Sequence, residues 1–571
     1  MSIHDQPTLD GLADAFWQAY LEAQPQAATL LGEPGHDDRL PDHTPDGLRA
    51  QRARYASIRD ALGQLEEAAG APDDLIARST LRDALDEQLA ALDSGLLAWN
   101  VDTLDGIPVE LLNMADYQPA ATPQDRANLV ARWRAIGPHV DAHAAALLRS
   151  LDDGGLVACV APVDRVIDIL DGVLAEPDDA WPLMAPARSA SSLALSSVEA
   201  ERFAGDVEAA IRDSVRPAFT RLRDTLADTI RPAARPSERP GLLHVPGGEA
   251  AYRLLARAHT TLDADPEELH RIGLDEIERI DAETEELARR VLGARDRETA
   301  VAALRADPAL HFRTRDEVFA KAATSLARAV EAIPDWFGRL PATPCDVVAM
   351  PAHEEEHSTI AYYRQPSADG SRPGRYFINT GRPETRPRYE AEALAYHESV
   401  PGHHLQIAIS QELPGLPPYR RHLGPNAFVE GWGLYVERLA DEMGLYSGDL
   451  DRIGVLSFDA WRASRLVVDT GMHALGWTRQ QAIDFMLEHT VLAPNNVVNE
   501  VDRYIVMPAQ ALSYKMGQLE LLRLRSGARE RLGAAFDIRA FHDTVLGSGA
   551  VGLATLRALV DDWIAGTLRA G

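Results

Sequence analysis

Three histidines and a glutamate lie close together between positions 397 and 404 of the chain. His397 and Glu398 end a run of strong helix formers that begins at Glu390, so both are expected to stand on a helix. A histidine followed by a glutamate on a helix is where zinc hydrolases keep their first metal ligand and their general base. The stretch therefore predicts a zinc site with His397 as a ligand and Glu398 as the base.

The spacing of the second histidine departs from the usual zinc motif. Two histidines that share one zinc ion normally stand four residues apart, because they then project from the same helix face. Here a Pro-Gly pair intervenes, and the next histidines are His403 and His404. Since proline breaks the hydrogen-bond ladder and glycine tolerates strained dihedrals, we expect a local bulge in the helix. A two-residue bulge would bring His403 to His397, and a three-residue bulge would bring His404.

A third ligand is expected on the next helical segment, Asn426–Glu437. Zinc sites with two histidines often take a glutamate from a following helix as their third ligand. Glu430 is suitably placed, and apolar neighbours such as Phe428 and Trp432 predict that it is buried. Because a buried carboxylate needs a cation, Glu430 is our candidate third ligand for Zn²⁺.

The segment Tyr504–Gly517 supplies three further candidates. Tyr504 and Tyr514 could donate a hydrogen bond to the oxyanion that forms when water attacks a carbonyl. Lys515 is one of only two lysines among 57 basic residues, and such a rare lysine indicates a need for a compact point charge. If Lys515 faces the active-site cleft, it could pair with a substrate's C-terminal carboxylate, which would make the enzyme a carboxypeptidase or dipeptidase.

A literal HExxH motif also occurs, at His353–His357. Its interior positions include Glu355 and Glu356, which would add two anions where zinc helices are normally uncharged. The flanking residues favour a strand or a loop rather than a helix. We therefore expect no catalytic metal at this motif.

Composition narrows the choice of partners and compartment. The chain has 571 residues and a net charge of −30, which argues against nucleic acid and anionic membranes as partners. No stretch approaches the roughly 20 apolar residues of a membrane span, and the N-terminus lacks a basic start followed by an apolar block. The two cysteines are isolated from each other and from every motif. We expect a cytoplasmic protein without disulfides.

Periodicity predicts a mainly α-helical fold. Short runs rich in aromatic and branched residues predict strands near 346–352, 358–365 and 374–380, and so a small β-sheet flanking a deep active-site cleft. A Pro- and Arg-rich stretch near 230–249 is the expected boundary between an N-terminal helical region, 1–240, and a catalytic region, 241–571.

Three motifs in this order, HESVPGHHLQ, EGWGLYVE and PAQALSYKMG, resemble the bacterial family named domain of unknown function 885. The resemblance extends over most of the chain and implies a zinc-dependent metallopeptidase with a large zincin-like helical fold. More distantly, His397-Glu398 with Gly402-His403 is similar to the HExGH of oligopeptidases with two residues inserted. Glu430 and the next glycine are similar to the Glu-Gly of leukotriene hydrolase-type aminopeptidases. These resemblances favour His403 over His404.

The expected function is a zinc-dependent hydrolase that cleaves a peptide or amide bond in a short peptide or small metabolite. The same residues would also suit a zinc enzyme of specialised metabolism acting on a non-peptide amide or ester. A non-catalytic binding protein on the same fold is a third possibility. The presence of Glu398 argues against it, because a binder needs no base beside its metal.

Overall fold

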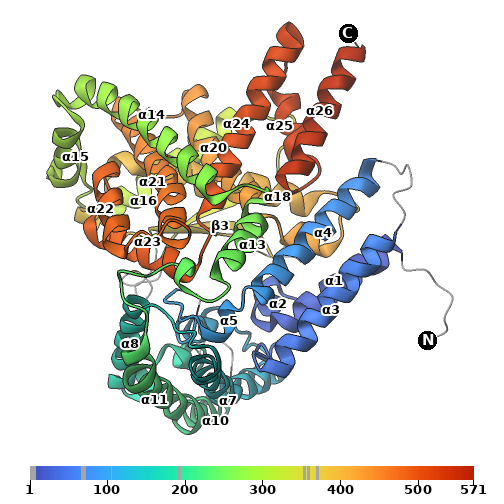
Figure 1. The fold of residues 1–571 in the computed structure, drawn as a ribbon, viewed down its shortest axis with the longest axis vertical. Coiled ribbons are helices and arrows are strands. Elements are labelled where there is room, and N and C mark those ends of the chain that lie inside the picture. Colours follow the sequence, from blue (N-terminus) through green and yellow to red (C-terminus); the bar gives the residue numbers. More distant parts are fainter. Residues whose placement is uncertain are drawn as a thin grey trace.

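The computed structural model describes residues 8–65, 72–104, 106–189, 195–350, 355, 360–367 and 372–570. The protein is mainly helical, with one small sheet near its centre (Figure 1). Among the helices of these residues, none combines the length and the apolar character needed to cross a bilayer.

The first part of the chain forms two groups of helices. Its α-helices are α1 (Leu9–Ala23), α2 (Pro25–Leu31), α3 (Pro45–Gln64), α4 (Pro72–Asp93), α5 (Leu96–Trp99), α6 (Val109–Asn113), α7 (Pro123–Gly154), α8 (Val160–Ala175), α9 (Ala185–Arg188), α10 (Ser197–Ala210), α11 (Arg216–Thr225) and α12 (Arg231–Ala233). Helices α1, α3 and α4 enclose one apolar core around Phe16 and Tyr55. Helices α7, α8, α10 and α11 enclose another around Trp133 and Phe219, at the lower end of Figure 1.

Local sequence signals explain where α7 begins and ends. The Thr122 hydroxyl accepts a hydrogen bond from the Asp125 backbone N–H, and the Asp125 carboxylate accepts one from the Thr122 N–H. Pro123 occupies the first turn, where a missing N–H costs nothing. Gly155 then ends the helix in the left-handed conformation, with φ 63°.

The second part of the chain carries the predicted motifs. Its α-helices are α13 (Gly248–Thr260), α14 (Pro266–Leu292), α15 (Arg297–Ala306), α16 (Arg315–Ala332), α17 (Ala391–Glu398), α18 (His403–Glu412), α19 (Pro418–His422), α20 (Asn426–Glu442), α21 (Asp449–His473), α22 (Arg479–His489), α23 (Pro494–Val506), α24 (Leu512–Leu532), α25 (Ile538–Leu546) and α26 (Leu553–Ala570). Helices α20 and α24 approach so closely that a Cβ on Gly431 would lie 2.4 Å from the Gly517 Cα. The division expected near residue 240 stays a prediction, and Ile76 of α4 shares an apolar core with Trp432 of α20.

The sheet contains β1 (Cys345–Ala349), β2 (Ala361–Arg364) and β3 (Gly374–Ile378) in the order β1-β3-β2. Strand β1 runs parallel to β3, pairing Val347 with Tyr376, and β2 runs antiparallel to β3. These strands confirm the predicted small sheet. Tyr376 and Ile378 pack in one apolar core with Leu394 of α17, so the sheet lies beside the helix that carries His397.

The structure describes only one of the five residues of the HExxH motif, Glu355. His353 and His357 lie outside the described residues, so the prediction that the motif binds no catalytic metal is not tested. Glu355 is described, and its carboxylate pairs with the Arg315 guanidinium.

Candidate metal centre

The chain turns sharply between His397 and His403. Helix α17 ends at Glu398 and α18 begins at His403, with a cis Val400–Pro401 peptide bond between them. Gly402 folds against the end of α17, where a Cβ would lie 1.9 Å from the His397 carbonyl oxygen. The expected bulge within one continuous helix is therefore wrong. The extra residues form a break between two helices, because Pro401 cannot continue α17 and only glycine fits the close approach that follows.

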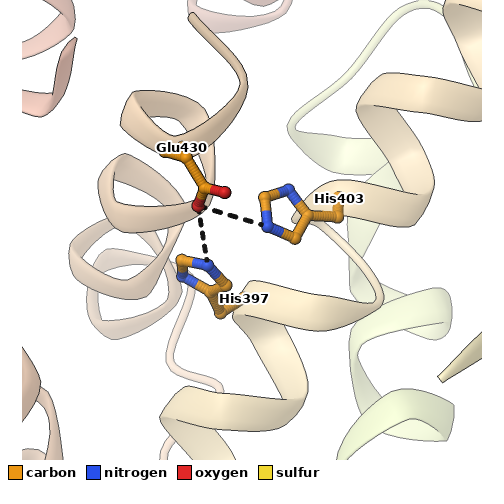
Figure 2. A group of neighbouring side chains, drawn as sticks. All are labelled: His397, His403 and Glu430. Carbon is orange, nitrogen blue, oxygen red and sulfur yellow. Dashed lines mark ion pairs between the residues drawn. The ribbon is translucent and has the colours of Figure 1, made fainter. Parts of the chain in front are cut away.

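This break brings His397, His403 and Glu430 together, and we call these three residues the metal trio. His397 comes from the last turn of α17, His403 from the first turn of α18, and Glu430 from α20. Both imidazole rings face one carboxylate oxygen of Glu430, and its Oε2 lies 3.6 Å from each histidine Nε2 (Figure 2). One ligand atom from each residue lies within 4.8 Å of the others. Both histidines are buried, whereas the Glu430 side chain is 20% exposed.

The spacing suits a shared cation better than a direct hydrogen bond. At 3.6 Å, the nitrogen–oxygen separations exceed hydrogen-bond length. Two ligand atoms bound tetrahedrally to one zinc ion, each about 2.1 Å from it, lie about 3.4 Å apart. Two imidazole nitrogens and one carboxylate oxygen are also the donor set of known catalytic zinc sites. The metal trio therefore fits a zinc ion in both distance and chemistry.

The pKa values of the metal trio indicate which proton a bound cation would displace. Burial lowers the pKa of His397, but the carboxylates of Glu430 and Glu437 outweigh it and raise this pKa to about 10. Burial raises the pKa of Glu430, yet His397 and His403 hold it well below its usual value. Without a metal, this raised pKa favours the protonated form of His397. Metal binding must displace this proton, because imidazole coordinates in its neutral form.

Glu437 holds the outer nitrogen of His397. The His397 Nδ1 lies 2.7 Å from the Glu437 Oε1, and both side chains are buried. A carboxylate that accepts the Nδ1–H leaves the Nε2 lone pair free to coordinate a metal, as in many histidine sites. Glu437 lies seven residues after Glu430, two helical turns further along α20. Their seven-residue spacing was the available signal for this supporting role.

His404 points away from the metal trio. Its Nδ1 lies 2.9 Å from the Tyr363 hydroxyl, and its Nε2 lies 3.0 Å from the Thr343 carbonyl oxygen. Burial also lowers the pKa of His404. Because both ring nitrogens are engaged at the sheet side, the structure brings His403 to His397 and does not bring His404.

Glu398, the candidate base, is the last residue of α17. It follows His397 directly and is half-buried. Within the described part of the chain, its carboxylate makes no hydrogen bond and no ion pair. An ionised carboxylate without a competing partner can accept a proton from a nearby water.

The two tyrosines differ in how they are engaged. The Tyr504 hydroxyl donates to Glu500 at 2.5 Å and accepts from the Arg465 Nε at 2.9 Å. Its only proton is therefore donated to Glu500 in this structure, and the oxyanion role expected for Tyr504 stays a prediction. The Tyr514 ring lies 4.3 Å from the Arg465 guanidinium carbon. Its hydroxyl has no hydrogen-bond partner among the described residues, so Tyr514 remains a candidate donor.

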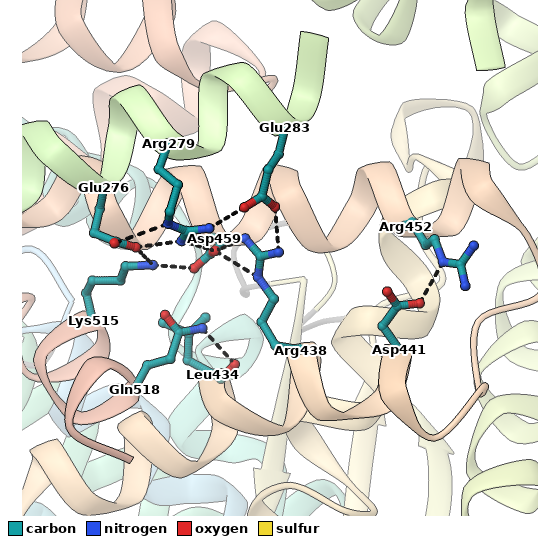
Figure 3. A network of polar contacts seen from close by, with 10 residues as sticks. All are labelled: Glu276, Arg279, Glu283, Leu434, Arg438, Asp441, Arg452, Asp459, Lys515 and Gln518. Carbon is teal, nitrogen blue, oxygen red and sulfur yellow. Dashed lines mark hydrogen bonds and ion pairs between the residues drawn. The ribbon is translucent and has the colours of Figure 1, made fainter. Parts of the chain in front are cut away.

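Lys515 does not face an active site. It is fully buried, with its Nζ 2.6 Å from Asp459 and 2.8 Å from Glu276. Figure 3 shows these groups with Arg279, Glu283 and Arg438 in one network, which joins α14, α20, α21 and α24. Three cations meet three carboxylates there, so the lysine's charge is already balanced. The expected pairing of Lys515 with a substrate carboxylate is corrected accordingly.

Comparisons with known proteins agree with this architecture. The chain is similar to the crystal structure of "the putative lipoprotein from Colwellia psychrerythraea", with a TM-score of 0.91, 26% identity, and 98% of this chain and 100% of that chain covered. A "putative lipoprotein of unknown function from Shewanella oneidensis" shares the fold, with a TM-score of 0.74, 17% identity, and 97% and 99% covered. No curated protein matches the chain. The family described as "Bacterial protein of unknown function (DUF885)" matches residues 25–560. The chain therefore belongs to the DUF885 family.

Proposed function

We propose that this protein is a zinc-dependent hydrolase that cleaves a peptide or amide bond in a short peptide or small metabolite. The observation that carries this proposal is the metal trio, whose His397, His403 and Glu430 ligand atoms have the spacing of zinc ligands. A zincin-like relationship and an active-site cleft in front of the metal trio are parts of the same proposal.

Each residue of the site has a defined task in such a hydrolase. A zinc ion held by the metal trio would lower the pKa of a bound water toward about 7 and polarise the scissile carbonyl. Glu398 accepts the proton of the attacking water and returns it to the leaving nitrogen. Glu437 keeps the His397 ring in the tautomer whose Nε2 faces Glu430. The Tyr514 hydroxyl is the candidate donor to the developing oxyanion.

Burial of the site favours a small substrate. Both histidines of the metal trio are buried, and helices α17, α18 and α20 surround them. A folded protein could not present a peptide bond to such a site, whereas a short peptide or an amide-bearing metabolite could. The cytoplasmic location stays a prediction, and two proteins of the same fold are described as putative lipoproteins.

The proposal is tested by removing and restoring the metal. We expect the purified protein to hydrolyse members of a panel of dipeptides, N-acetylated dipeptides and acylated amines. A chelator should abolish this activity, and about one equivalent of zinc should restore it, because the metal-bound water is the nucleophile. Liquid chromatography of the products provides the measurement.

The same panel separates the competing functions. Hydrolysis that survives complete metal removal would contradict the proposal. Cleavage of acylated amines or esters but of no peptide would favour an enzyme of specialised metabolism. Zinc-loaded protein that cleaves no member of the panel would favour a binding protein.

A further inference from the structure

Arg462 of α21 is a buried arginine whose hydrogen-bond donors are not used. It is only 5% exposed, and its guanidinium carbon lies 4.6 Å from the Phe458 ring centre and 4.2 Å from that of Trp461. Within the part of the chain that the structure describes, its Nε and Nη1 are buried without a hydrogen-bond partner. Among the described residues its one ion-pair contact joins Nη2 to the Glu437 Oε1 at 4.0 Å, which is too long for a hydrogen bond.

This arrangement destabilises the folded protein when no ligand is bound to Arg462. A guanidinium has five N–H donors, and burying a charged group without hydrogen-bonded partners destabilises the folded state. Glu437 does not compensate in the described part of the chain: its Oε1 accepts from His397 and lies 4.0 Å from Arg462, and its Oε2 is itself buried without a hydrogen bond. Arg465, one turn further along α21, is different: its Nε and Nη2 bind Tyr504 and Glu500. Arg462 therefore lacks an acceptor that its neighbour has.

Two series of contacts connect Arg462 to the metal trio. On one side, Glu437 lies between the guanidinium and the His397 ring. On the other side, Trp461 contacts Arg462 and also lies 4.7 Å from the Arg465 guanidinium carbon, which in turn lies over Tyr514.

Helix α24 connects Tyr514 to the same site. Tyr514 precedes Gly517 by less than one helical turn, so both residues lie on one face of α24. Gly517 packs directly on Gly431, the residue after Glu430. Through Arg465 and Tyr514, the helix that carries Arg462 is thus connected to α20 beside Glu430.

We propose that Arg462 binds a carboxylate of the substrate, so that the enzyme removes the C-terminal residue of a short peptide or of an N-acylated amino acid. This inference rests on the proposed hydrolase function and specifies its substrate class. The planar guanidinium can donate two parallel N–H bonds to a carboxylate, a geometry that a lysine cannot provide. Arg462 thereby takes the role that the sequence suggested for Lys515, whose charge the protein itself balances.

The test compares a free acid with its amide. The probes are N-acetyl-dialanine and its C-terminal amide, assayed with the zinc-loaded protein. We expect the wild type to prefer the acid, and Arg462→Met to lose about 10- to 100-fold in kcat/KM on the acid, since hydrogen bonds between charged groups contribute strongly. The rate on the amide should stay unchanged. Arg462→Lys should recover only part of the preference for the acid, because lysine keeps the positive charge but cannot donate two parallel N–H bonds to a carboxylate.

A matched control and a binding measurement keep the result interpretable. Arg479 is a partly buried arginine whose guanidinium binds Asp502, so Arg479→Met removes an arginine that already has a protein partner. It should leave the ratio of acid to amide rates unchanged. Calorimetric binding of N-acetyl-dialanine to the zinc-loaded Glu398→Gln protein, with and without Arg462→Met, tests recognition without turnover.

Two results would overturn the assignment of Arg462. An equal loss on acid and amide would mean that Arg462 only supports Glu437 and His397. Equal rates of the wild type on both probes, with equal binding, would exclude carboxylate recognition. Preferential binding of the acid that depends on Arg462, without hydrolysis of either probe, would contradict the hydrolase proposal and still support the arginine site.

Discussion

The Glu398→Gln protein is expected to keep its zinc and to lose most of its hydrolytic activity. Glutamine has nearly the shape of glutamate, so α17 and the metal trio should be undisturbed, but its amide cannot accept the proton of the attacking water. Loss of a general base typically lowers the rate by about 10²- to 10⁴-fold. Turnover of a cleaved panel substrate, measured together with zinc content, tests this expectation.

A comparison with Glu437→Gln distinguishes a base from a residue that supports a ligand. Because Glu437 orients His397, its replacement should weaken zinc affinity, by about 10- to 100-fold, rather than act on the proton transfer alone. Near-wild-type turnover by zinc-loaded Glu398→Gln would mean that another carboxylate, such as Glu390 or Glu437, activates the water. The assignment of Glu398 would then be wrong.

The Lys515→Met protein is expected to be about 3–5 kcal/mol less stable to unfolding, because the change leaves the buried Asp459 and the partly buried Glu276 short of a cation. Burial alone would raise the pKa of Asp459, but Lys515 and Arg438 hold it well below its usual value. Asp459 therefore contributes stability that is present above about pH 4 and is lost as the pH falls. Urea unfolding curves at pH 7 and at about pH 2 measure both effects.

The control for Lys515 is an exposed ion pair. Arg531 pairs with Asp561 at the surface, so Arg531→Met should cost less than about 1 kcal/mol. Lys515→Met should also leave the preference for a free acid over an amide unchanged. An unaltered stability combined with a lost acid preference would restore Lys515 as the residue that recognises the substrate.

Local sequence signals predicted most of the fold. At the start of α14, for example, Pro266 occupies the first turn and the Asp265 carboxylate accepts a hydrogen bond from the Glu267 N–H. Branched and aromatic runs predicted the three strands near their observed positions. These features depend on neighbours in sequence, which is why they could be read without a structure.

The candidate site was predictable only in part. His397, Glu398 and Glu430 could be singled out from residue type and spacing, and a family resemblance favoured His403. The form of the break before His403 could not be derived, because it depends on how closely Gly402 approaches the end of α17. The partners of Lys515 and the environment of Arg462 lie on other helices, and contacts of that kind leave no local pattern in the sequence.

Zinc content of the wild type, His403→Ala and His404→Ala tests the central claim most directly. Elemental analysis after identical purification, with circular dichroism to verify folding, should find about one zinc per chain in the wild type and in His404→Ala. His403→Ala should contain almost no zinc, because it lacks one of the three ligands of the metal trio. Full zinc in His403→Ala, or loss of zinc in His404→Ala alone, would contradict the proposed metal centre.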